Sequence, residues 1–115
     1  MTSESIREFC LSMKAVTEGF PFGGDALVFK VKGKMFALLS LESRWLNLKC
    51  DPENAISLRE QYSSVIPGYH MNKNLWNTII LDSNIPEKLL RQWITDSYDL
   101  VVKGLPGRVR EELKH

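Results

Sequence analysis

The sequence predicts an α+β fold: a single domain over residues 1–115, in which a mainly antiparallel sheet of about five strands packs against helices. Two observations support this prediction. Apolar residues recur at helical spacing near both ends of the chain and once in its middle, with strand-like alternation between them. The helices and strands do not alternate regularly, as they would around a parallel sheet. A chain of 115 residues is long enough for one hydrophobic core.

The N-terminal residues predict a short amphipathic helix. Thr2 or Ser3 can accept a hydrogen bond from the first free amide groups of such a helix. Apolar side chains then follow at helical spacing: Ile6, Phe9, Cys10 and Met13. Residues 19–24 end the pattern because they contain a proline and three glycines. We expect the two phenylalanines of this loop, Phe20 and Phe22, to pack onto the core.

Residues 26–41 predict a β-hairpin. A two-residue turn at Lys32 and Gly33 would pair Val31 with Lys34. The same register would place like residues opposite each other, with Phe29 facing Phe36 and Leu27 facing Leu38. Residues 44–50 alternate again and predict a third strand, with one face formed by Trp45, Asn47 and Lys49 and the other by Leu46, Leu48 and Cys50.

A second helix is predicted to begin after Asp51 and to run to about Tyr62. Asp51 is a typical N-cap, and Pro52 fits the first helical position because no amide partner is lost there. Its buried side would carry Ala55, Leu58 and Tyr62.

The C-terminal half predicts two more strands and a long helix. A turn at Pro67 and Gly68 would lead into strands over residues 69–73 and 76–81. Pro86 then begins the helix. Its broad apolar face would carry Leu89, Leu90, Trp93, Ile94, Ser97, Tyr98 and Val101. Residues 104–107 end this helix, and the charged tail over residues 108–115 would add a weak helical turn or fray.

Charge and cysteine content limit the classes of function. Lys and Arg number 15 against 14 Asp and Glu, so no global field attracts a polyanion and a nucleic-acid site would need local clustering. Cys10 and Cys50 have no Cys-x-x-Cys spacing, which predicts free thiols and a cytoplasmic protein. The apolar runs are too short to span a bilayer, which excludes a membrane-spanning role.

Residues 67–73, with Trp76 and Asn77 behind them, form the chemically densest segment of the chain. Together with other segments it resembles the MmcQ/YjbR family of small bacterial proteins across nearly the whole chain. The matching segments are Phe20-Pro21-Phe22-Gly23, Phe29-Lys30-Val31, Gly33-Lys34-Met35-Phe36-Ala37-Leu38, Leu48-Lys49-Cys50-Asp51-Pro52-Glu53, Leu58-Arg59-Glu60, residues 67–73, Trp76-Asn77 and Ser97-Tyr98-Asp99-Leu100-Val101.

The resemblance implies an α+β fold similar to secretion-chaperone and frataxin-like folds. It also implies a proposed double-wing mode of DNA binding and no established enzymatic activity. One departure concerns that mode: similar proteins often carry a basic residue and a histidine just before the tryptophan, where this chain has Asn74 and Leu75.

Two classes of partner follow for this segment. Double-stranded DNA would be gripped by two basic hairpins, because phosphate contacts need flexible cations and an aromatic ring can stack on bases. The alternative is a protein or a small ligand, bound by aromatic walls with a few polar groups. The residues for DNA are Lys30, Lys32, Lys34, Lys49, His70, Lys73 and Trp76; those for the alternative are Trp45, Asn47, Lys49, Tyr69, His70, Asn72, Lys73, Trp76 and Asn77.

Purely structural roles remain open for several of these residues. Tyr69 and Trp76 could be core aromatics, and Asn72 and Asn77 could hold turns. Exposure of His70 and Trp76 together in a concavity would favour a binding site.

Catalysis is the weakest of the three interpretations. His70 would have to act with Cys50, Asp51 or Asp82, and the sequence supplies no geometry for such a pair. Metal binding lacks clustered Cys and His ligands, and the first helix offers only Glu4 and Glu8 as an acidic pair. We therefore predict a non-enzymatic protein without a metal or cofactor.

Overall fold

The computed structural model describes residues 1–82 and 85–114, which form one six-stranded antiparallel sheet and four helices. The strand order is β1-β2-β3-β4-β6-β5. The strands are β1 (Val16–Gly19), β2 (Ala26–Val31), β3 (Lys34–Ser40), β4 (Trp45–Lys49), β5 (Val65–Pro67) and β6 (Trp76–Ile80). The helices are α1 (Ser3–Ser12), α2 (Pro52–Gln61), α3 (Glu87–Lys103) and α4 (Gly107–Leu113). The predicted α+β class is confirmed, with six strands instead of about five.

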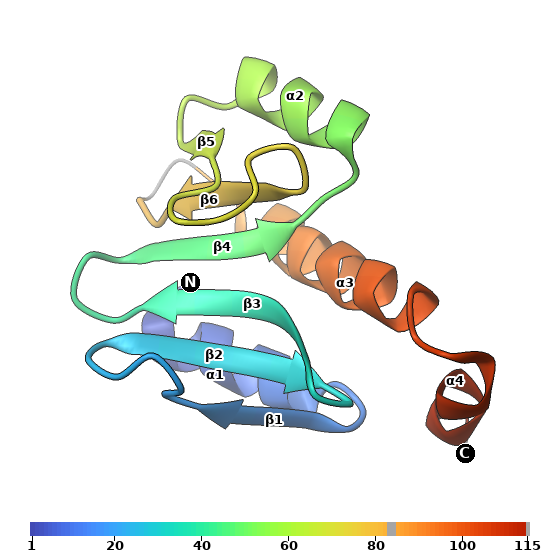
Figure 1. Cartoon of the computed structure of the whole chain (residues 1–115). Coiled ribbons are helices and arrows are strands. Elements are labelled where there is room, and N and C mark those ends of the chain that lie inside the picture. The colour runs from blue at the N-terminus through green and yellow to red at the C-terminus, as the bar shows by residue number, and fades with distance from the viewer. Residues whose placement is uncertain (83–84, 115) are drawn as a thin grey trace.

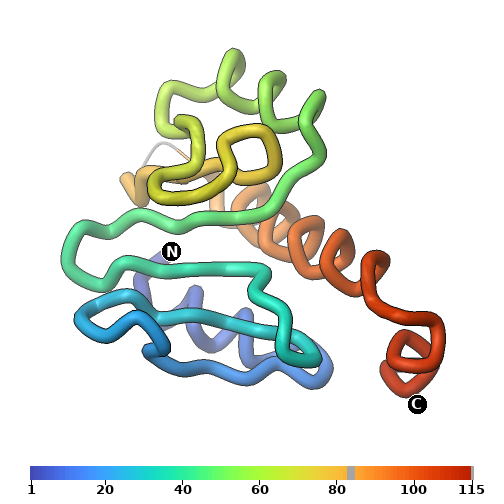
Figure 2. Tube along the Cα trace, viewed as in Figure 1, coloured from blue at the N-terminus to red at the C-terminus, as the bar shows by residue number. Residues whose placement is uncertain are grey.

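The helices leave one side of the sheet uncovered. Helices α1 and α3 lie behind the sheet in Figure 1, and α2 lies beside the β5–β6 edge. The α4 segment turns off the end of α3 (Figure 2). None of the described helices is long and apolar enough to cross a membrane.

Local capping signals set the helix starts as predicted. Thr2 caps α1, and its side chain and that of Ser5 each accept the other residue's backbone N–H. Asp51 caps α2 by accepting the Asn54 N–H at 3.1 Å, with Pro52 at the first turn.

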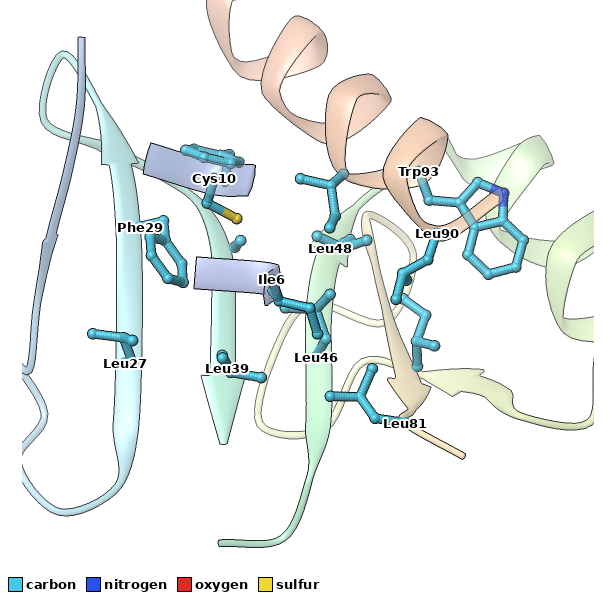
Figure 3. Packing of buried hydrophobic residues seen from close by; sticks show 14 of the residues in the cluster. Ile6, Cys10, Leu27, Phe29, Leu39, Leu46, Leu48, Leu81, Leu90 and Trp93 are labelled. Atoms are coloured by element: carbon cyan, nitrogen blue, oxygen red, sulfur yellow. The ribbon is translucent and has the colours of Figure 1, made fainter. Parts of the chain in front are cut away.

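The hydrophobic core lies between the sheet and the two helices behind it (Figure 3). Ile6 and Cys10 from α1 and Ile94 from α3 are fully buried there. Because side chains alternate along a strand, the core receives every second residue of β2 and β4. The sheet contributes Leu27, Phe29, Val31, Phe36, Ala37, Leu39, Leu46, Leu48, Val65 and Ile79.

The β2–β3 hairpin contains a bulge that the predicted register missed. The turn pairs Val31 with Lys34 as expected, but Phe29 faces Ala37 and Leu27 faces Leu39. Phe36 is the extra residue of the bulge, so it enters the core together with its neighbour Ala37. The prediction failed because two consecutive core residues do not fit a regular strand.

A serine of α3 supplies the hydrogen bond that this bulge lacks. Ser97 is fully buried, and its hydroxyl donates to the Phe36 carbonyl at 2.6 Å. The same oxygen accepts the Lys49 N–H at 2.8 Å. One side chain therefore ties α3 to both β3 and β4.

One strand was not predicted, and two other predictions were wrong. Residues 16–19 form an edge strand, which was missed because it runs directly into the glycine-rich loop. Residues 69–73 form no strand, whereas residues 65–67 do. Phe20 and Phe22 are 50% and 70% exposed instead of packed onto the core.

Replacing Ser97 by alanine should destabilise the protein by about 1–3 kcal/mol, because two buried backbone groups lose their partner. Equilibrium urea unfolding measures this change. Thr95→Ala is the matched control on the same helix, since its hydroxyl donates only to the Arg91 carbonyl one turn back. Equal effects of the two substitutions would contradict the bridging role of Ser97.

Candidate binding face

The candidate site is the helix-free face of the sheet. The register places Asn47 beside Thr78 and Leu38 beside Asn47 on this side, opposite to the core residues. Val28 and Leu38 are buried there although no described helix covers them. Two loops lie on this face instead. Phe20 and Pro21 lie beside Val28, and residues 68–75 lie by β6 and β4 (Figure 2).

A closed set of hydrogen bonds holds the second loop on the sheet. The Thr78 hydroxyl donates to the Asn47 side-chain oxygen and accepts the Tyr69 N–H at 2.8 Å. The Asn47 amide group in turn donates to the Tyr69 carbonyl at 3.1 Å. Both backbone groups of Tyr69 are thus bonded to strand side chains, so residues 69–73 cannot pair as the strand we predicted.

The loop is tight as well as anchored. A Cβ atom on Gly68 would come within 2.8 Å of the Trp76 Cβ, so no larger residue fits. His70 has a positive φ of 60°, which breaks a strand. Asn72 accepts the Asn74 N–H at 2.9 Å and holds the turn, which is the structural role considered for it in the sequence analysis.

Three of the residues predicted for DNA are engaged within the protein. Trp76 is 8% exposed and therefore not available for stacking on bases. The Lys73 ammonium donates to the Gly68 carbonyl at 3.0 Å. Lys32 forms an ion pair with Glu112 of α4 at 3.1 Å. Joint exposure of His70 and Trp76, which would have favoured a binding site at these two residues, is not found: His70 is exposed and Trp76 is buried.

The exposed aromatic surface belongs to Tyr69 instead. This residue is 51% exposed. Its ring lies edge-on to Trp45 at 5.8 Å between centroids and 4.0 Å from the His70 ring. Thr78, which anchors the loop that carries Tyr69 and His70, was not among the predicted site residues. In the sequence, a threonine within a β-branched run cannot be distinguished from any other strand residue.

The face also has a one-sided charge. Among the described strand residues that point to it, Lys30 and Lys49 are charged and none carries a carboxylate. Lys34 is exposed at the hairpin turn of β2 and β3. Asp25 reaches one end of the face, where Ser40 donates to it at 2.7 Å and lowers the pKa of its carboxyl group.

Asn77 points to the other side of the sheet from this face. Its Nδ2 donates to the Ala55 carbonyl of α2 at 3.2 Å, while no described residue donates to its buried Oδ1. Such an unpaired acceptor costs about 1–3 kcal/mol of stability. Asn77 is thus absent from the binding face on which we predicted it.

Cys50 and Asp51, two of the proposed catalytic partners of His70, also lie away from this face. Both line a cavity between α2 and α3. Burial, followed by the charges of Asp51 and Asp96, raises the pKa of the Cys50 thiol to about 11. An activated Cys–His pair would show the opposite shift. The described residues contain no group of three or more His, Cys, Asp or Glu side chains placed to hold a metal ion.

Sequence comparison identifies the family. The YjbR family model matches residues 11–100. The chain belongs to the YjbR family. YjbR-family relatives include YbdF of Escherichia coli O157:H7, 40% identical over 96% of this chain and 93% of the relative. YjbR of E. coli K12 is 31% identical, with 98% of each chain covered. The resemblance predicted from the sequence is confirmed.

Solved structures share the YjbR fold described above. The crystal structure of Deinococcus radiodurans protein DR2400 has a TM-score of 0.92 and 39% identity, covering 98% of this chain and 88% of that one. A Pseudomonas syringae protein has a TM-score of 0.75 and 26% identity, covering 87% of this chain and 98% of that one.

Replacing Thr78 by valine should release the loop, because Tyr69 and Asn47 both lose their partner. We expect faster hydrogen exchange of the Tyr69 amide and a loss of about 1–3 kcal/mol in unfolding free energy. NMR hydrogen exchange and urea unfolding measure the two effects. Thr17→Val, on an exposed residue of β1, is the control. Unchanged protection of the Tyr69 amide would show that the hydroxyl does not anchor the loop.

Alkylation of Cys50 should keep accelerating up to about pH 11 in the folded protein. In urea its rate should level off above about pH 8.5, the ordinary thiol pKa. Because folding raises this pKa, the stabilisation from the protonated thiol is complete below about pH 8.5 and is lost as the pH rises toward the folded value. Iodoacetamide labelling with peptide mass spectrometry gives both curves. A plateau below about pH 8 would instead indicate an activating partner such as His70.

Proposed function

We propose that this YjbR protein is a non-enzymatic binding module whose helix-free face binds nucleic acid. The observation that carries the proposal is that Lys30, Lys49 and the half-exposed Tyr69 lie on the same face. None of the described strand residues of this face carries a carboxylate. Cations that contact phosphates and a ring on which a base can stack are the two elements of such a surface.

The geometry changes the expected mode of binding. The predicted wedge, Trp76, is buried, so the aromatic contact passes to Tyr69, whose ring Trp45 supports from the side. A ring that lies on a sheet face suits an unpaired base better than the interior of a duplex. We therefore expect single-stranded DNA to bind at least as well as duplex DNA.

A protein partner is the second candidate. It is favoured by apolar side chains exposed on this face and in the β1–β2 loop, because exposed apolar surface marks contact sites. These residues are Phe20, Phe22, Ile66 and Ile80.

Proximity labelling in cells should then yield a protein that the Ile66→Ser variant loses and the Lys88→Glu variant keeps.

Fluorescence anisotropy tests the nucleic-acid proposal directly. A labelled single strand of about 20 nucleotides and the matching duplex are titrated at about 50 mM and 200 mM salt. Tyr69→Ala should weaken single-strand binding by about 1–3 kcal/mol, the range of one stacking contact. The Lys30→Glu, Lys49→Glu double variant should weaken binding to both probes and flatten the salt dependence.

The control carries the same change of net charge away from the face. It is the Lys14→Glu, Lys88→Glu double variant, with both positions exposed and outside the sheet strands. Equal losses in the two double variants would reject the assigned face. No anisotropy change with either probe at low salt would reject nucleic-acid binding and leave the protein partner.

A further inference from the structure

A cavity of about 360 Å³ lies between α2 and α3, on the helix-covered side of the sheet. Its volume falls within the range of about 300–1,000 Å³ that small-molecule sites occupy. The interior is apolar, with side chains from β4, β5, β6 and both helices: Leu48, Leu58, Val65, Ile79 and Trp93. Figure 3 shows two of these, Leu48 on β4 and Trp93 on α3.

One polar group belongs to this apolar lining. Asn77 is 2% exposed and lines the cavity. Its Nδ2 is committed to the Ala55 carbonyl at 3.2 Å, which fixes the orientation of the amide and leaves Oδ1 as an acceptor. No described residue donates to that oxygen. A ligand N–H that displaces the side chains around this buried oxygen would supply the donor that the protein does not.

The rim of the cavity favours a cation. Asp51, Asp96 and Asp99 line it, together with Lys103 and Lys49. By the strand register, the Lys49 side chain points to the helix-free face. The carboxylates act on a common region: burial and then Asp96 raise the pKa of Asp99, and Asp51 and Asp96 both contribute to the raised pKa of Cys50. Among charged ligands, an ammonium group is therefore favoured over a carboxylate.

We propose that this cavity binds a small, largely apolar molecule carrying a protonated amine, with its apolar body on Trp93 and Leu58 and its N–H toward Asn77. Apart from Lys49, which borders both, this site is separate from the helix-free face. Its occupancy therefore does not depend on whether that face binds nucleic acid.

Three matched probes test the proposal by NMR on the ¹⁵N-labelled full chain: 2-phenylethylamine, 3-phenylpropanoate and ethylbenzene. We expect saturable shifts of the Trp93 indole and Asn77 amide signals, with the amine bound about tenfold more tightly than the carboxylate. Absence of saturable shifts at these signals with all three probes, which would leave ordered water as the only occupant, overturns the site. Equal affinity for amine and carboxylate overturns the ligand class.

Two variants separate the contributions. Asn77→Leu should weaken the amine by about tenfold while ethylbenzene still binds. Unchanged amine affinity in this variant overturns the role of Asn77. If Asn77→Leu does not fold, the Asp96→Asn, Asp99→Asn double variant decides, since it should remove the preference for the amine over ethylbenzene. Tyr69→Ala is the control on the opposite face, and it should leave all three affinities unchanged.

Discussion

The hydroxyl of Ser97 is the interaction on which the arrangement of α3 and the sheet depends. It satisfies the Phe36 carbonyl at the bulge of β3 and the Lys49 amide near the end of β4. The bulge in turn allows two consecutive residues to enter the core. Because the same bonds fix α3 relative to β4, they also set one wall of the cavity beside Trp93. A single buried polar group therefore links the core, the sheet and a candidate site.

The two faces of the sheet are covered by different kinds of element. Behind the sheet, the helices contribute apolar side chains and leave a cavity between α2 and α3 that Asn77 also lines. In front, a loop bonded to Asn47 and Thr78 replaces a helix and keeps its backbone groups satisfied through side chains. This loop leaves Tyr69 and His70 exposed. The surface that carries the proposed function is thus presented by a loop that the strands hold in place.

Local signals predicted most of the fold, and long-range contacts account for the errors. Asp51 and Pro52 set the start of α2 through groups within one helical turn, so the sequence sufficed. The bulge that shifts the β2–β3 register is hydrogen-bonded to Ser97, 61 residues away in the sequence. The strand predicted at residues 69–73 was replaced by a loop that Thr78 anchors from a neighbouring strand. Likewise, tryptophan is a residue type that can stack on bases, and only the tertiary packing showed that Trp76 is buried.

Pro67 has a consequence for how the sheet ends. It closes β5, a strand of three residues at the outer edge beyond β6. Proline has no amide hydrogen with which to pair a further strand, and an edge this short offers little template for one. The exposed Ile66 beside it would otherwise favour self-association by strand addition. At this edge the protein can therefore display apolar side chains for recognition while discouraging the growth of the sheet from one molecule into the next.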